Sequence, residues 1–307
     1  MPEAGAEVVA AGQVAQTGYA PPPRPRALPH GKWPWLGLAV WGSALSILAL
    51  FGWLMWDVLV HGLPQLSWTF LTESPQDAGR AGGIGPIIVS TLLILGVCMA
   101  ASVPLGLGAA VALAEYTAPD RGIGRLLRRL LDVLAAVPSI VFGLFGNALF
   151  AIHLGLGFSI LSGGLTLACM VLPIFIRTAE SAVSAVSGDI RQAAAALALS
   201  RWRTLSTLLL PLALPGLMAG FVLGLGRAIA ETAALVFTSG YVDRMPGSLL
   251  DSGRALSIHI YDLSMNISGG EAMAYASAAV LVLLLLILNA GVLQLARLWQ
   301  ARSLRLA

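Results

Sequence analysis

Charged side chains are scarce in this chain. Of its 307 residues only 11% are Asp, Glu, Lys or Arg, whereas 57% are hydrophobic. A soluble domain carries about 25% charged residues, and so small a share could not cover the surface of a water-soluble fold. Lipid requires no such polar cover. The composition therefore excludes a soluble globule and places the chain in a bilayer.

Lysine and cysteine are nearly absent as well. Lys32 is the only lysine, and it lies outside any glycine-rich phosphate loop, so the sequence has no Walker A motif and we expect no ATP hydrolysis by this chain. Cys98 and Cys169 each lie in an apolar run, which favours buried packing over a disulfide scaffold. The four histidines lack metal-ligand spacing. We therefore expect no catalytic centre, metal site or cofactor in this chain, and the slight excess of basic residues does not indicate nucleic acid binding.

Long uncharged stretches are the main feature that is present. A membrane helix needs about 20 predominantly apolar residues. The stretch at 133–176 is long enough for two crossings, and the GLGF at 155–158 predicts a turn between them. The sequence therefore predicts an all-α, multi-pass membrane protein with six helices, at 35–57, 86–114, 133–152, 158–179, 207–237 and 272–296.

The ends of the chain and its orientation follow from composition and arginine placement. Residues 1–32 are rich in Ala, Pro and Gly and predict a disordered tail rather than a cleaved signal. With the N-terminus in the cytoplasm, 13 of the 18 basic residues lie on the cytoplasmic side, and the opposite side holds only Arg80, Arg244 and Arg254. The positive-inside rule then predicts that both termini are cytoplasmic.

The cytoplasmic stretch between the fourth and fifth predicted spans contains a helix-forming run, DIRQAAAALALSRWR at 189–203. Ala193 to Ala196 give it a narrow face, and arginines hold its ends in water. Such a helix can insert into a groove on a partner protein. The alternative is a helix that lies on the membrane surface and is anchored by its arginines.

Charged residues inside the apolar spans are functional candidates, because an intramembrane ionisable group costs at least about 2.5 kcal/mol on insertion scales. Arg227 and Glu231 are separated by four residues, so we expect them on one face of one helix. They form either a structural ion pair or a polar contact that lines a pathway. Arg177 lies at the cytoplasmic end of the fourth predicted span, where its guanidinium either snorkels to headgroups or takes part in transport.

Several strings resemble one protein family. RQAAAALALSRWRT (191–204) followed by LPLALPG (210–216) resembles the EAA loop, through which permease subunits of bacterial ATP-binding-cassette (ABC) importers dock on their ATPase. More narrowly, the chain resembles the A-type permease subunit of phosphate-specific transport systems from about residue 33 to the end. The supporting strings are GGIGPIIVST (82–91), PLGLGAAVALAEY (104–116), VPSIVFGLFG (137–146), LPIFIRTAE (172–180) and GLGRAIAETAALVFT (224–238).

The resemblance implies the type I ABC importer permease fold in the bacterial inner membrane. It implies a first helix with an outer loop (33–82), a five-helix core (83–300) with a coupling segment at about 188–204, and a short C-terminal tail (301–307). The implied partners are a homologous C-type permease, two ATPase subunits that carry the ATP and Mg²⁺, and a periplasmic phosphate-binding protein.

The resemblance also assigns residues. Arg177, Arg227 and Glu231 match charged positions associated with transport, and the coupling positions are Arg191, Gln192, Ala193, Ala194 and Ala198. Two of these depart from the family pattern. Gln192 replaces the usual Glu and loses its charge, and Ala198 replaces the usual Gly and restricts the turn that glycine allows.

Other functions stay open at this stage. A secondary anion transporter with Glu231 as its proton carrier needs no ATPase, although the alanine-rich docking helix argues against it. A membrane scaffold or sensor without conduction is a further alternative. The resemblance implies phosphate as the substrate, and another tetrahedral oxyanion stays open because the spans contain nothing that distinguishes such anions.

Overall fold

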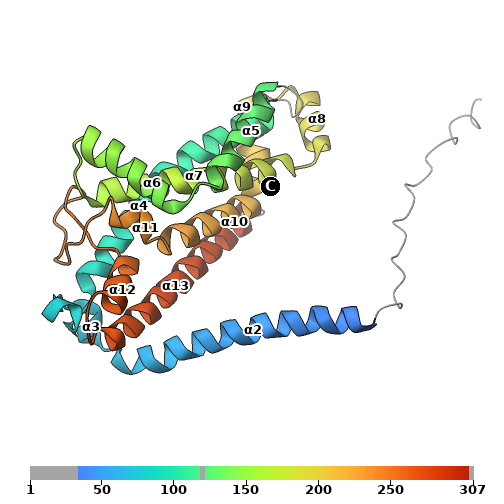
Figure 1. Cartoon of the computed structure of the whole chain (residues 1–307). Helices are drawn as coiled ribbons and strands as arrows, with labels where there is room; N and C mark the ends of the chain where they lie inside the picture. The colour runs from blue at the N-terminus through green and yellow to red at the C-terminus, as the bar shows by residue number, and fades with distance from the viewer. Residues whose placement is uncertain (1–33, 118–121, 304–307) are drawn as a thin grey trace, which may run out of the picture. The chain divides into compact units, whose positions relative to one another are not determined.

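The computed structural model describes residues 34–117 and 122–303 (Figure 1). The chain divides into two units, Met1–Leu54 and Met55–Ala307. The tail predicted at 1–32 lies outside the described residues. Helix α2 spans Pro34–Gly62, and its last eight residues belong to the second unit.

The second unit is a helical bundle with small elements at its two ends. After α2 come η2 (Leu63–Gln65), α3 (Trp68–Thr72), β1 (Pro75–Gln76), η3 (Asp77–Gly79) and β2 (Ala81–Gly82). The two strands pair antiparallel, with Pro75 opposite Gly82. The bundle then consists of α4 (Gly85–Val111) with its π-helical end η4 (Ala112–Tyr116), α5 (Gly122–Ala135), α6 (Ser139–Gly146), η5 (Asn147–His153), α7 (Ile160–Ser184), α8 (Gly188–Ala196), α9 (Arg201–Thr204), η6 (Leu205–Leu209), α10 (Leu210–Ile229), α11 (Ala233–Val236), α12 (Leu256–Met265) and α13 (Glu271–Ser303).

The predicted all-α membrane class is confirmed. Within the described residues, five helices are long and apolar enough to cross a membrane, or six if the bent pair of α5 with α6 and η5 counts as one span. The predicted turn at 155–158 is also confirmed, since Gly155 and Gly157 have φ values of +69° and +62°, which favour glycine. Helix α13 continues to Ser303, so residues 301–303 are helical rather than part of a tail.

The third predicted helix, 133–152, is wrong as one continuous helix. Residues up to Ala135 belong to α5, and the chain bends by 97° before α6. Pro138 stands at the bend as the N-cap residue of α6. Proline lacks an N–H group and disfavours helical backbone in the residue before it, so the helix ends there. The predicted helices left residues 115–132 as a loop, but α5 is an amphipathic helix that carries Arg125, Arg128 and Arg129.

Glycine lets the helices approach α7, which lies at the centre of the bundle. Gly216, Gly220 and Gly224 recur every fourth residue along α10 and therefore share one face. Atoms placed as Cβ on these three glycines would meet Ala182, Thr178 and Val171 of α7, respectively. Small residues at this spacing are typical of close helix contacts in membranes. On the other side of α7, Gly164 contacts α4 at Val97.

The two ends of the bundle differ in what covers them (Figure 1). At one, hereafter the α12 end, α3 and α12 pack against the start of α4 and against α13, around Phe70, Ile87, Leu256 and Val280. At the other, hereafter the α8 end, lie α5, α8 and α9. Residues 63–82, expected in a loop, thus contribute a small core to the α12 end.

Replacing Gly216 by alanine should destabilise the bundle by about 1–3 kcal/mol, the usual cost of overpacking. The new Cβ would lie 2.5 Å from the Cβ of Ala182, so α7 and α10 must separate. The control is Gly108→Ala on α4, where a Cβ meets nothing within 4 Å and helix propensity favours alanine. Thermal unfolding in detergent should show a lower midpoint for the first variant only. Equal midpoints would contradict the close contact.

Candidate coupling and transport site

The coupling segment consists of two short helices rather than the continuous run predicted at 189–203. The Ser187 hydroxyl caps α8 by accepting a hydrogen bond from the Asp189 N–H (3.2 Å), and the Ser200 hydroxyl caps α9 in the same way for the Arg203 N–H (3.3 Å). Serine is a favoured N-cap residue, and the alanines between the caps favour a helix. The segment therefore exposes two helix faces with a turn between them.

Ala198 makes that turn in a backbone conformation that suits glycine. Its φ is +51°, and the N–H groups of Ala198 and Leu199 close the end of α8 by donating to the carbonyls of Ala195 and Ala194, both at 3.0 Å. A left-handed conformation costs an L-residue roughly 1–2 kcal/mol. The expected restriction at Ala198 therefore does not prevent the turn but raises its conformational energy.

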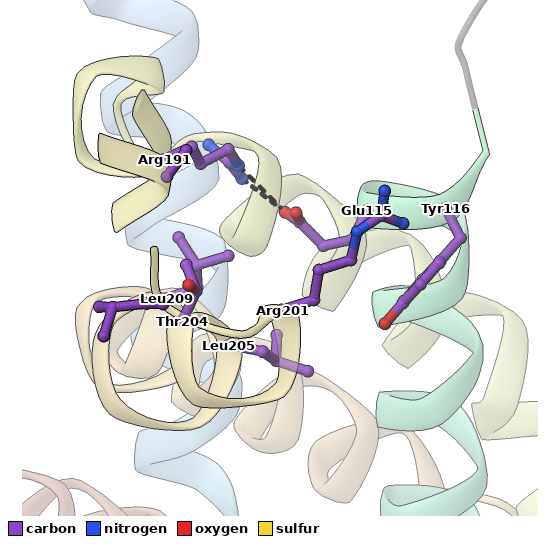
Figure 2. Close-up of a pocket in the computed structure, with 9 residues that line it drawn as sticks. Glu115, Tyr116, Arg191, Arg201, Thr204, Leu205 and Leu209 are labelled. Atoms are coloured by element: carbon purple, nitrogen blue, oxygen red, sulfur yellow. Dashed lines mark hydrogen bonds and ion pairs between the residues drawn. The ribbon is translucent and has the colours of Figure 1, made fainter. Parts of the chain in front are cut away.

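Arg191 fastens α8 to two neighbouring elements (Figure 2). Its Nη2 lies 2.7 Å from Oε1 of Glu115 on η4, and its Nε lies 3.2 Å from the same oxygen. The guanidinium also donates to the carbonyl of Val183, in the last turn of α7, and to that of Val186, two residues beyond the helix. The last carbonyls of a helix have no intrahelical hydrogen-bond donor, and here an arginine side chain donates to one of them. Arg191 thus contacts groups of its own chain.

The other coupling positions differ in exposure. Gln192, Ala193 and Ala198 are exposed, whereas Ala194 is buried against the bundle. Sequence reasoning missed Glu115, the partner of Arg191. The string AEY at 114–116 contains that carboxylate, but its partner lies 76 positions further along the chain.

Arg177 belongs to a charged network between α5 and α7. It lies 3.0 Å from Asp132 through Nε and 3.0 Å from Glu180 through Nη1. Glu180, with only 7% of its side chain exposed, also accepts from Arg128, which donates as well to the carbonyl of Leu113 on η4. Arg177 therefore joins α5 to α7.

Arg227 and Glu231 form an ion pair, with Nη2 and Oε1 3.2 Å apart. The expectation that both lie on one helix is wrong, because α10 ends at Ile229 and Glu231 lies in the break before α11. The Ser257 hydroxyl donates to the carbonyl of Glu231 at 2.6 Å and so satisfies part of the freed backbone. The side chain of Glu231 is 10% exposed and that of Arg227 is 45% exposed, so the arginine is the more accessible member of the pair.

The structure does not bring Arg177 and Arg227 together. Gly220 of α10 packs beside Thr178 of α7, and Gly224 packs beside Val171. Continuing this antiparallel pairing puts Arg227 about nine residues from the level of Arg177, on the order of 13 Å along the helix axis. Arg227 is nearer the α12 end, and Arg177 is nearer the α8 end.

A second buried charged cluster surrounds Arg254 at the α12 end. Its Nε donates to the carbonyl of Tyr241 (2.9 Å), and its terminal nitrogens lie 3.8 Å from Asp243 and 4.0 Å from Asp262. Its Nη1 is 3.4 Å from Nδ1 of His259, which is fully buried on α12. Burial, followed by the charge of Arg254, lowers the pKa of His259 to about 4. The sequence indicated Arg254 only as a basic residue on the outer side of the membrane, not as part of a site.

Replacing Ala198 by glycine should stabilise the coupling segment by up to about 1 kcal/mol, because glycine adopts positive φ without strain. The matched control is Ala196→Gly in the same segment, where the helical backbone makes glycine about 1 kcal/mol less favourable. Hydrogen exchange of the α8 amides should slow in the first variant and speed up in the second. Changes of the same sign in both would contradict the left-handed turn at Ala198.

Acidification should destabilise the α12 end through His259. Its pKa is about 4 in the folded chain and about 6.5 when unfolded, so as the pH falls between these values only the unfolded form takes up the proton. Thermal midpoints should therefore decrease over this window and show no contribution from His259 above it. His259→Gln should flatten the decrease, whereas His153→Gln, at an exposed histidine, should leave it intact. An unchanged slope in the first variant would contradict the assignment.

Comparison with known proteins gives the family. Residues 102–302 match the family described as the binding-protein-dependent transport system inner membrane component. The chain is 33% identical to a probable ABC transporter permease, YqgI, of Bacillus subtilis, over 82% of this chain and 90% of that protein. It is 30% identical to the phosphate transport system permease protein PstA of Haemophilus influenzae, over 80% and 88%, and 35% identical to PstA 1 of Mycobacterium tuberculosis, over 62% and 63%.

A solved structure has the same fold. The inward-facing MetNI methionine ABC transporter superposes with a TM-score of 0.55 at 18% identity, over 70% of this chain and 96% of that chain. Permeases of this kind are membrane subunits rather than enzymes, and they work with an ATPase, a second permease and a binding protein. The chain therefore belongs to the family of inner membrane components of binding-protein-dependent transport systems, as a PstA-type permease of an ABC importer.

Proposed function

We propose that the chain is a permease subunit of an ATP-driven importer of inorganic phosphate and forms half of its translocation pathway. The observation that carries the proposal is the similarity to a phosphate transport permease over 80% of the chain. The partly buried Arg227–Glu231 pair adds to it a cation that could contact an anion. In this proposal the α8 end and both termini face the cytoplasm. A homologous C-type permease supplies the other half of the pathway, and a phosphate-binding protein delivers the substrate at the α12 end.

The coupling segment receives the motion of a partner ATPase dimer, which holds the ATP and Mg²⁺. Gln192 and Ala193 are exposed on α8 and available for docking, and the Gln192 amide keeps hydrogen-bonding capacity without charge. Because Arg191 joins α8 to Glu115 on η4 and to the α7 carbonyls, a displacement of α8 pulls on two membrane helices at once. Alternating access follows when these helices move with the ATPase.

The Arg227–Glu231 pair gives the pathway a cation whose affinity for a passing anion is limited. The partly exposed guanidinium of Arg227 can bind two oxygens of a passing phosphate through parallel hydrogen bonds. Glu231 competes for the same guanidinium and so weakens the complex. Conduction requires such a balance, because the anion must leave as well as enter. The rival function, a proton carrier based on Glu231, has no such support, since its carboxylate is already paired.

Replacing Arg227 by alanine in the complete transporter should lower the initial rate of phosphate uptake at least tenfold. A tenfold change corresponds to about 1.4 kcal/mol, roughly the free energy that a charge-assisted hydrogen bond contributes. Because this leaves Glu231 buried and unpaired, the variant Arg227→Ala with Glu231→Gln separates loss of the contact from misfolding. Uptake of labelled phosphate by cells is the measurement, with membrane insertion checked by immunoblot.

Arg297→Ala is the matched control, since Arg297 is an exposed arginine on α13 and its loss should leave uptake unchanged. Near-normal uptake by the double variant would eliminate the proposed role of Arg227. Competition by unlabelled sulfate or molybdate as strong as that by phosphate would instead show that the importer serves another tetrahedral oxyanion.

A further inference from the structure

A cavity of about 180 Å³ opens at the α8 end, between η4 and the segment from α8 to η6 (Figure 2). Its lining residues are Glu115, Tyr116, Arg191, Ala195, Leu199, Arg201, Thr204, Leu205 and Leu209.

The position of the cavity relative to the membrane follows from two spans. One candidate membrane span ends at Tyr116, and another begins at Arg201. These helices of 32 and 29 residues are longer than the hydrocarbon core of about 30 Å requires, so their ends, and the cavity beside them, extend to the level of the phospholipid headgroups.

Arg201 supplies the cavity with an available positive charge. Its guanidinium carbon lies 6.0 Å from the centre of the Tyr116 ring, a cation–π distance, and Figure 2 shows the side chain reaching from α9 toward that residue. Among residues 34–117 and 122–298, no carboxylate lies within ion-pair distance of Arg201. The charge of Arg191 on the opposite wall is compensated by Glu115 at 2.7 Å. The lining thus carries one net positive charge, beside the hydroxyl of Thr204.

The remaining wall is apolar. Leu199, Leu205 and Leu209 line it, and the last two are buried in the bundle. Trp202, next to Arg201, has 74% of its surface exposed, as is usual for aromatic residues at a membrane interface. A ligand that meets a guanidinium and a leucine wall together must be both anionic and apolar. Free inorganic phosphate satisfies only the first requirement.

We propose that this cavity binds the headgroup of an anionic phospholipid. Arg201 contacts the lipid phosphate, Tyr116 orients the guanidinium, and the leucines contact the first part of an acyl chain. Arginine suits this role because its planar fork matches two phosphate oxygens. The proposal is independent of which substrate the importer carries. Its consequence is a lipid that fills the space between the end of α4 and the coupling segment.

Native mass spectrometry of the complete transporter tests the proposal. The detergent-solubilised complex is titrated with phosphatidylglycerol and, in parallel, with phosphatidylcholine. The chain with Arg201 should prefer the first phosphatidylglycerol molecule by about tenfold, and Arg201→Gln should abolish this preference. Arg203→Gln is the matched control, since Arg203 lies on the same short helix and does not line the cavity. Both arginines are exposed, so neither variant should alter the thermal midpoint.

Several outcomes would overturn the proposal. An equal loss of preference in both variants would indicate general attraction to a basic surface. An unchanged preference in Arg201→Gln would place the lipid elsewhere. Displacement of the lipid by inorganic phosphate or glycerol phosphate would show a site for soluble anions. Binding by the permease chain but not by the complete transporter would show that the ATPase covers the cavity.

Discussion

Two arginine side chains hold the end of α4, and the α8 end of the bundle is organised around these contacts. Arg191 binds the carboxylate of Glu115, and Arg128 donates to the carbonyl of Leu113, so η4 is fixed from α8 and from α5. The same arginines also contact α7, through its last carbonyls and through Glu180. Four helices therefore meet at one π-helical turn, a conformation often found at functional sites. In a partly buried setting such contacts are strong while complete, and losing one partner leaves the other poorly solvated.

The number and class of the spans could be read from the sequence, because lipid imposes the same local requirement on every membrane helix. The breaks within spans could not be read so easily. Pro138 marked the bend between α5 and α6, but nothing in the sequence stated that the arginine-rich segment before it would be helical. The break at Glu231 contains neither proline nor glycine, and the Ser257 hydroxyl that supports it lies 26 positions away. Interactions between distant residues decide such features.

The candidate site shows the same division between local and distant information. The departure at Ala198 was visible in the sequence, and a local backbone argument correctly located a conformational problem there. Glu180 is only three positions from Arg177, but Asp132, the other partner of Arg177, lies 45 positions away, and Glu115, the partner of Arg191, lies 76 positions away. The sequence therefore identified the two arginines without these distant carboxylates. The sequence did not predict the cluster around Arg254, because its members come together only when the loop before α12 folds back on that helix.

The glycine contact between α7 and α10 limits how an importer of this kind can change shape. Where backbones touch through glycine, there are few side chains that can switch rotamers and accommodate sliding. The two helices are thus suited to move as one rigid body, whichever partner drives them. A change of shape in the permease must then carry α7 and α10 together.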